Sequence, residues 1–437
     1  MTISAALKTK LLGAIDTDTL VFLCGAGLSM PSPSFLPSAA RVAEICYDKW
    51  VANEVLDVDL KYDVDKLAGH FHARSDFESI FIPLVPWNDL SGAPNRGHAA
   101  VSDLLISRGA HAALSANFDT MIERWAEQHK VAMQGALTGQ EATNFAANFS
   151  PLLKFHGCMQ RGKSATLWTN AQLAEPAVQA RIQSCSNWIN LHLPGRHLVV
   201  VGFWTDWGYL NDVLANAFAI TNALSVTVID PTPTAALQAK AAQLWDKLTT
   251  SSVSFDHIQE SGDVILEELR VAYSISWAKK FYALGRPLAD ASGIVHSPSP
   301  DGLACDDLYN LRRDVEGVPY TRAAMLKAPP ADAAEAAFAH IELGNDGAVQ
   351  TGAWLEHGGQ TVRIVNGAGR GLSDVQQAHL EPPNLAQPDI VLCAGAIDLG
   401  VPARLIATGT GASIVSPAPG GGAKWLTRAD ARTELGL

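Results

Sequence analysis

Short apolar runs alternate with longer amphipathic stretches over residues 1–284. Five of the runs consist mostly of Val, Leu, Ile, Ala and Phe, which is typical of strands buried on both faces of a parallel sheet. The runs that we predict to be strands span residues 20–24, 112–115, 152–155, 197–201 and 225–229. Between them, apolar positions recur with a helical period at 99–107, 120–129 and 235–248. This alternation predicts a Rossmann-like α/β fold, a parallel sheet with helices on both faces.

Four further segments depart from this alternation or follow it. Residues 36–97 are less regular, with helical stretches and aromatic residues, and we expect them to be an insertion packed over the sheet. A helical pattern at 262–282 closes the first domain, 1–284. Pro, Ser and Gly then predict a linker at 285–302. Residues 303–437 are rich in Gly, Ala and Pro and predict a smaller, mixed or β-rich accessory domain, with short apolar runs at 361–365, 390–393 and 404–407.

Composition agrees with a folded, acidic protein. Hydrophobic residues make up 48% of the chain and charged residues 17%, so there is enough apolar material for packed cores. The formal net charge is −12, from 32 Lys and Arg against 44 Asp and Glu. Because such a chain gains little from a phosphate backbone, we expect no direct binding of nucleic acid.

The cysteines and the chain start bear on location and metals. Six cysteines are scattered without a C-x-x-C pair, which favours free thiols in a reducing compartment and no metal site. The first residues lack the apolar core of a signal peptide, and no stretch has the length needed to cross a bilayer. We therefore expect a cytoplasmic protein that does not bind membranes.

The first candidate motif is Gly25-Ala26-Gly27-Leu28-Ser29, directly after a predicted strand. Glycines at this place let the backbone approach a pyrophosphate, whose charge is favoured by the amide groups of a following helix. A structural turn that binds nothing is the alternative for this motif alone.

Polar residues follow two further strands. Asn117 and Asp119 come just after the strand at 112–115, where ligands bind in open α/β sheets. Helix capping is the alternative for both residues, and we favour it for Asp119. His156 ends the run Lys154-Phe155-His156-Gly157 and can act as a general base near neutral pH. Its alternative is a buried histidine bonded to the backbone.

Two more strand ends complete the set. Gly202, Thr205 and Asp206 follow the strand at 197–201, and Asp206 either binds a ribose or caps the next helix. Asp230 ends the strand at 225–229, where an acidic side chain can bind the hydroxyl groups of an adenosine ribose. A plain strand-ending turn is its alternative. In this order, at successive strand ends, the motifs form one constellation.

The series G-A-G-L-S, A-N-F-D, K-F-H-G and G-F-W-T-D resembles the sirtuin family, and specifically the prokaryotic sirtuin-like branch found in anti-phage defence systems. The resemblance covers about residues 10–280, and Pro94 and His98 ahead of a helix also look like that branch. It implies that Asn117 positions a water at the nicotinamide ribose of NAD+ and that His156 is the base. The residues implied to bind the rest of NAD+ are Gly25, Ala26, Gly27, Ser29, Asp119, Gly202, Thr205, Asp206 and Asp230.

Departures from the family decide between activities. Deacetylating sirtuins carry paired cysteines for a structural zinc, and this chain has none, so the resemblance favours NAD+ hydrolysis to ADP-ribose and nicotinamide over protein deacylation. It further implies a triggered effector of abortive infection, as a homo-oligomer or with a HerA-type ATPase or a short Argonaute-like partner. The alternatives are a sensor of NAD+ or an NAD-derived ligand that does not turn it over, and an NAD-dependent deacylase.

Overall fold

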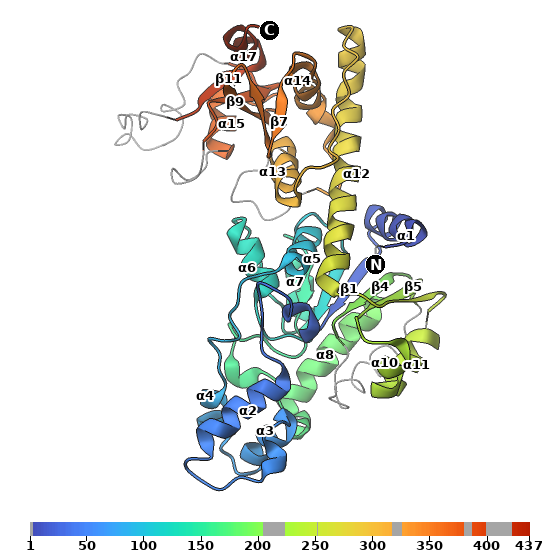
Figure 1. The fold of residues 1–437 in the computed structure, drawn as a ribbon, viewed down its shortest axis with the longest axis vertical. Helices are drawn as coiled ribbons and strands as arrows, with labels where there is room; N and C mark the ends of the chain where they lie inside the picture. The colour runs from blue at the N-terminus through green and yellow to red at the C-terminus, as the bar shows by residue number, and fades with distance from the viewer. Residues whose placement is uncertain (1–2, 204–222, 251, 317–325, 380–386, 399–421) are drawn as a thin grey trace. The chain divides into compact units, whose positions relative to one another are not determined.

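The computed structural model describes residues 3–203, 223–250, 252–316, 326–379, 387–398 and 422–437 (Figure 1). The chain divides into two compact units, Met1–Leu269 and Arg270–Leu437. The boundary falls within helix α12 (Gly262–Ala291). No helix in the described ranges is long and apolar enough to cross a membrane.

The first unit is built on a parallel sheet of six strands in the order β3-β2-β1-β4-β5-β6. The strands are β1 (Leu20–Cys24), β2 (Ala112–Ser115), β3 (Leu152–Leu153), β4 (His197–Val201), β5 (Ser225–Ile229) and β6 (Phe255–Ile258). The five predicted strands are confirmed, although β3 ends at Leu153 because the Lys154 amide donates to the Ala136 carbonyl instead (2.7 Å). Strand β6 was missed because its half-buried sequence, Phe-Asp-His-Ile, has no continuous apolar run.

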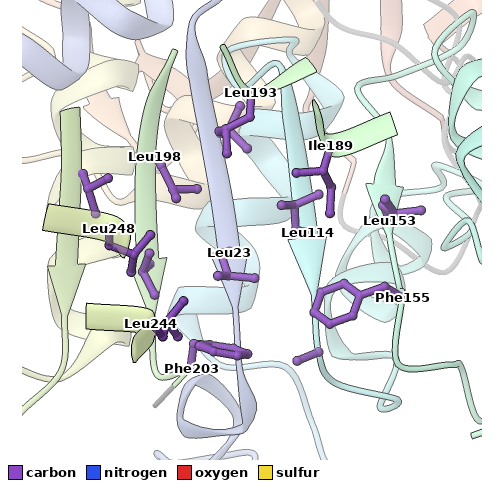
Figure 2. Close-up of a cluster of buried hydrophobic side chains, with 14 of the residues drawn as sticks. Leu23, Leu114, Leu153, Phe155, Ile189, Leu193, Leu198, Phe203, Leu244 and Leu248 are labelled. Atoms are coloured by element: carbon purple, nitrogen blue, oxygen red, sulfur yellow. The ribbon is translucent and has the colours of Figure 1, made fainter. Parts of the chain in front are cut away.

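Helices pack on both faces of this sheet. Val21 and Leu23 of β1 belong to one cluster with side chains of α8 and α11 (Figure 2). Leu20 and Phe22 are buried too but lie outside that cluster, because successive side chains of a strand point to opposite faces. The helices of the first unit are α1 (Ala5–Asp16), α2 (Ala39–Trp50), α3 (Val64–Ala73), α4 (Ile82–Leu84), α5 (Arg96–Ile106), α6 (Met121–Gln128), α7 (Gly139–Phe145), α8 (Pro176–His192), α10 (Thr234–Lys240) and α11 (Ala242–Thr250).

The insertion predicted at 36–97 forms a core of its own. Helices α2 and α3 contribute aromatic and aliphatic side chains to it, among them Phe71, and Phe81 and Trp87 join from the segment after α3. Trp168, which follows β3 by some distance in the sequence, joins the same cluster and contacts Phe118 with ring centroids 4.6 Å apart. The insertion is therefore packed against the loops that leave β2 and β3.

The second unit contains a mixed sheet of five strands in the order β11-β10-β9-β8-β7. The strands are β7 (Val349–Thr351), β8 (Trp354–His357), β9 (Gln360–Asn366), β10 (Ile390–Ala394) and β11 (Lys424–Thr427), of which β9, β10 and β11 are parallel. Its helices, besides most of α12, are α13 (Cys305–Glu316), α14 (Ala334–Asn345), α15 (Leu372–His379) and α17 (Arg428–Leu435). The expected mixed accessory fold is confirmed, while the run at 404–407 lies outside the described residues.

Helix α12 continues beyond the point where the sequence predicts a linker. Gly285 lies inside it and packs against α14, since an added Cβ would meet the Phe338 amide nitrogen at 2.5 Å. The glycine therefore permits close helix packing and does not end the helix. The domain limits 1–284 and 303–437 stay a prediction.

The loops that leave β1 and β4 touch through their backbones. The Gly25 amide donates to the Val201 carbonyl (2.9 Å), and the Gly27 amide donates to the Gly202 carbonyl (2.8 Å). A Cβ on Gly25 would lie 2.2 Å from Phe203 Cα, so only glycine fits there. Gly202 itself has a φ of 56°, in the left-handed region that glycine favours.

We expect Gly25→Ala to destabilise the protein by about 1–3 kcal/mol or more, because the clash is with backbone that cannot rotate away. Gly13→Ala is the matched control: its Cβ meets nothing within 4 Å inside α1, and alanine in a helix is favoured by up to about 1 kcal/mol. Thermal unfolding followed by circular dichroism measures both. A Gly25→Ala protein as stable as the parent would contradict this account of the loop contact.

Candidate functional site

A cavity of about 570 Å³ lies at the carboxyl ends of the strands, within the size range of small-molecule sites. It brings together nine of the site residues predicted from the sequence: Gly25, Ala26, Gly27, Ser29, Asn117, Asp119, His156, Gly202 and Asp230. Thr205 and Asp206 lie outside the described residues. The insertion supplies apolar lining that sequence reasoning missed, from Leu36, Val42 and Leu90.

Gly25 is followed directly by a 3₁₀ turn, Ala26–Ser29, at the place where the sequence predicts the start of a helix. Pro31 and Pro33 explain the short turn, because proline has no amide hydrogen and restricts the residue before it. With its amide bonded to Gly202, Gly27 serves the contact between the loops. A pyrophosphate at this place would have to be bound by other groups.

The carboxamide of Asn117 has one defined orientation. Its Nδ2 group lies 3.0 Å from the Gly25 carbonyl oxygen and 3.3 Å from Ser29 Oγ. Because a carbonyl only accepts hydrogen bonds, the nitrogen and not the oxygen must face Gly25. This leaves Asn117 Oδ1 as the acceptor for a ligand hydroxyl group or a water in the cavity.

Ser29 joins this amide to a buried hydrogen-bond network. The Asn95 amide donates to His98 Nδ1 (3.2 Å), so the ring proton is on Nε2, which donates to Ser29 Oγ (3.0 Å). The Ser29 hydroxyl in turn donates to Asp119 Oδ2 (2.9 Å). With Asn117 as its second donor, Ser29 uses its one donor and both acceptor positions. A contact between Ser29 and a phosphate would require one of these bonds to open.

Burial keeps the two histidines of the site neutral. His98 is 1% exposed, and burial lowers its pKa to about 4, although the nearby Asp119 carboxylate acts in the other direction. His156 is 2% exposed, and burial lowers its pKa to about 3 despite a hydrogen bond to the Ala116 backbone that raises it. The His156 ring also lies against the ring of Phe118, with centroids 6.2 Å apart. At neutral pH, His156 is therefore an uncharged imidazole.

The two acidic residues of the cavity are bound to backbone amides. Asp119 Oδ1 accepts from the Met121 amide (3.1 Å) at the start of α6, so it caps the helix as well as binding Ser29. Asp230 Oδ1 accepts from the Thr232 amide (2.8 Å) in the turn after β5. Both carboxylates therefore hold local backbone in place as well as lining the cavity.

No group of three His, Cys, Asp or Glu residues that could bind a metal is found in the described ranges. All six cysteines are buried and free.

Comparisons with known proteins return distant structural matches. No family model and no curated protein matches the chain. A solved complex of a Sir2 homologue with NAD is similar to it with a TM-score of 0.36 and 14% identity, covering 60% of this chain and 91% of that chain. A second solved structure, from work on the mechanism and regulation of Sir2 enzymes, has a TM-score of 0.31 and 12% identity, covering 61% of this chain and 97% of that chain. Because both likenesses are distant, the fold class rests on the strand order and register given above.

Ser29→Ala should destabilise the protein by about 1–3 kcal/mol, because His98 Nε2 and Asp119 Oδ2 would stay buried without this partner. The matched control is Ser102→Ala, which removes an equally buried hydroxyl that makes no hydrogen bond within the described ranges. That control should be neutral. Urea unfolding measures both variants, and equal effects would mean that the Ser29 network contributes nothing to stability.

Lowering the pH from about 7.5 to about 5 should destabilise the protein. In the unfolded chain His98 and His156 take up protons as the pH falls through their ordinary pKa of 6.5, whereas in the folded protein they stay neutral down to about pH 4 and about pH 3. The unfolded state thus binds more protons in this window, so stability falls with pH. The urea midpoint tests this, and His156→Asn should show a weaker dependence. A midpoint that rises on acidification would exclude the neutral buried histidines.

Proposed function

We propose that the protein hydrolyses NAD+ to ADP-ribose and nicotinamide. The observation that carries the proposal is that Asn117 and His156 line the same cavity, together with Gly25, Gly202 and Asp230. The side chains of Asn117 and of the neutral His156 belong to residues that line one cavity at the carboxyl edge of a parallel sheet, which is where such folds bind nucleotides.

The chemistry requires a water, a base and a leaving group held in place. Asn117 Oδ1 orients a water at the anomeric carbon of the nicotinamide ribose. The bond from that carbon to the nicotinamide nitrogen breaks, the bond to the water oxygen forms, and His156 accepts the water proton. Because the reacting carbon is electron-poor at this stage, a neutral amide and a neutral imidazole avoid a stable ion pair with it.

Five of the other predicted residues have proposed roles with the rest of the substrate, and Asp230 a role at its adenosine end. Gly25, Ala26 and Gly202 let the pyrophosphate approach the backbone, and Thr205 and Asp206 are proposed to line the same cleft. Asp230 accepts hydrogen bonds from the adenosine ribose. Since its carboxylate would repel a 2′-phosphate, NAD+ is preferred to NADP+.

The resemblance to defence-associated sirtuin-like proteins extends the proposal to a biological role. The enzyme is a triggered effector that depletes NAD+ during phage infection. Because unrestrained hydrolysis would deplete the host's own NAD+, the activity is controlled by homo-oligomer assembly or by a protein partner, either a HerA-type ATPase or a short Argonaute-like protein. The second unit is the proposed place of that control.

The test is NAD+ consumption by the purified chain, with nicotinamide and ADP-ribose resolved by chromatography. Asn117→Ala and His156→Ala should each lower kcat by about 100-fold or more, because one loses the water-orienting group and the other the base. The matched controls are Asn53→Ala and His70→Ala, whose side chains lie in the insertion outside the cavity lining. Both should retain the parental rate.

The same assay separates the other activities. NAD+ loss that requires an added acetyl-lysine peptide would assign a deacylase. NAD+ binding by calorimetry without loss of NAD+, alone or with peptide, would assign a sensor and overturn the hydrolase proposal.

A further inference from the structure

A charged side chain is buried directly beside the proposed site. Lys154 is 1% exposed and follows β3 immediately, two residues before His156. The motif Lys154-Phe155-His156-Gly157 predicts a role for the histidine and none for the lysine. Lysine is almost never fully buried unless it is paired, so its partners indicate why it is there.

The ammonium group of Lys154 connects two segments of the chain. Its Nζ atom lies 2.9 Å from Glu123 Oε1 of α6, whose side chain is also buried. It also donates to the backbone carbonyl of Asp119, two residues after Asn117. One side chain thus joins the end of β3 to the loop between β2 and α6.

Lys154 remains charged in this environment. Burial disfavours the ammonium form, but the Glu123 carboxylate and the nearby Cys158 and Asp119 act in the other direction, and the pKa of Lys154 is raised overall. A buried ion pair is often no more stabilising than an apolar pair of the same volume. Stability therefore gives little reason for this pair, and its geometry is the better explanation.

The surroundings leave room for the lysine stem. A Cβ on Gly135 would lie 2.3 Å from Lys154 Cδ and 2.9 Å from Cγ, so the absence of a side chain at Gly135 lets the stem pass. The same Cβ would be 3.0 Å from Glu123 Oε1. Gly135 therefore leaves space for both members of the ion pair.

Only two residue pairs join β3 to its neighbour β2 in the sheet. Strand β3 pairs with β2 at Ala113↔Leu152 and Leu114↔Leu153, and Asn117 and His156 both lie beyond that ladder. After His156, the Met159 amide donates to the Phe118 carbonyl (2.9 Å). Before His156, Lys154 binds the Asp119 carbonyl. The segment that carries His156 is thus tied to the segment that carries Asn117 on both sides.

We propose that Lys154 is a positioning residue, whose ammonium group, paired with Glu123, fixes the loop after β2 against the end of β3 and so sets Asn117 and His156 in place for one reaction. The proposal concerns the hydrolysis described above and rests on that function. Lys154 acts through the Asp119 carbonyl and Glu123 and does not itself touch the substrate.

The main test variant is the double substitution Lys154→Met with Glu123→Leu, which replaces the ion pair by apolar groups and leaves no charge unpaired. We expect it to fold with a thermal midpoint at or above that of the parent. Its kcat should fall by about 10–100-fold, because small misplacements of reacting groups are costly, while KM and the calorimetric Kd for NAD+ change little. Gly135→Ala, which displaces the lysine stem but keeps both charges, should lower kcat in the same way. Lys154→Arg, which keeps a positive charge at this position, should retain most of the parental kcat.

A second readout does not depend on activity. Titration of the His156 ring by NMR should show its pKa moving from about 3 towards the ordinary value of 6.5 in the double variant, as the loosened loop admits water. Lys10→Met is the matched control, because it removes the contact of Lys10 Nζ with Asp256 Oδ2 (2.7 Å) on a different edge of the sheet. It should leave both kcat and the His156 titration as in the parent.

The outcomes separate the two proposals. A double variant with parental kcat and an unchanged His156 titration overturns the positioning role. A parent that binds NAD+ but does not hydrolyse it, and whose His156 titration still shifts in the double variant, overturns the hydrolase proposal while supporting the role of Lys154 in placing His156.

Discussion

The contact between the backbones after β1 and β4 is the constraint on which the site depends. Gly25 and Gly27 lie so close to Gly202 and Phe203 that a single Cβ would force the loops apart. Because β1 occupies the middle of the sheet, between β2 and β4, this contact also fixes the place from which Ser29 reaches Asn117. The glycines of the first motif are therefore needed for the contact between the two loops, whether or not a ligand is bound.

Polar contacts connect these two loops to the loops that follow the neighbouring strands. Asn117 donates to the Gly25 carbonyl, and Ser29 is hydrogen-bonded to His98, Asn117 and Asp119. Such buried networks are costly when any member lacks a partner and rigid when all are satisfied. Lys154 continues the chain of contacts to β3, so the end of each of these strands is held by a side chain or a backbone bond from its neighbour.

The sequence was most informative where local pattern and global fold agree. Apolar runs at 20–24, 112–115, 197–201 and 225–229 are buried parallel strands with those limits, because central strands need apolar residues on both faces. The edge strand β6 escaped detection since only part of each side chain is covered. The polar residues at the strand ends could be predicted to lie in one site because the carboxyl ends of parallel strands meet at one edge of the sheet.

What the sequence could not show were contacts between residues distant in the chain. Nothing local indicates that Gly285 meets α14, or that Gly135 makes room for the Lys154 stem. The saturation of Ser29 by three partners depends equally on positions 69 to 90 residues apart. Charge and size at one position say little about such arrangements until the neighbours are known.

The direction of the protons in the Ser29 network has a consequence for its chemistry. Ser29 contacts a histidine and an aspartate, which is the composition of a hydrolase triad, in which histidine removes the serine proton. Here His98 Nδ1 accepts from the Asn95 amide, so Nε2 is a donor, and the serine proton points to Asp119. His98 cannot deprotonate Ser29, and the hydroxyl is held as an acceptor by its two donors. In this arrangement Ser29 therefore lacks the histidine base that a hydrolase triad supplies to its serine.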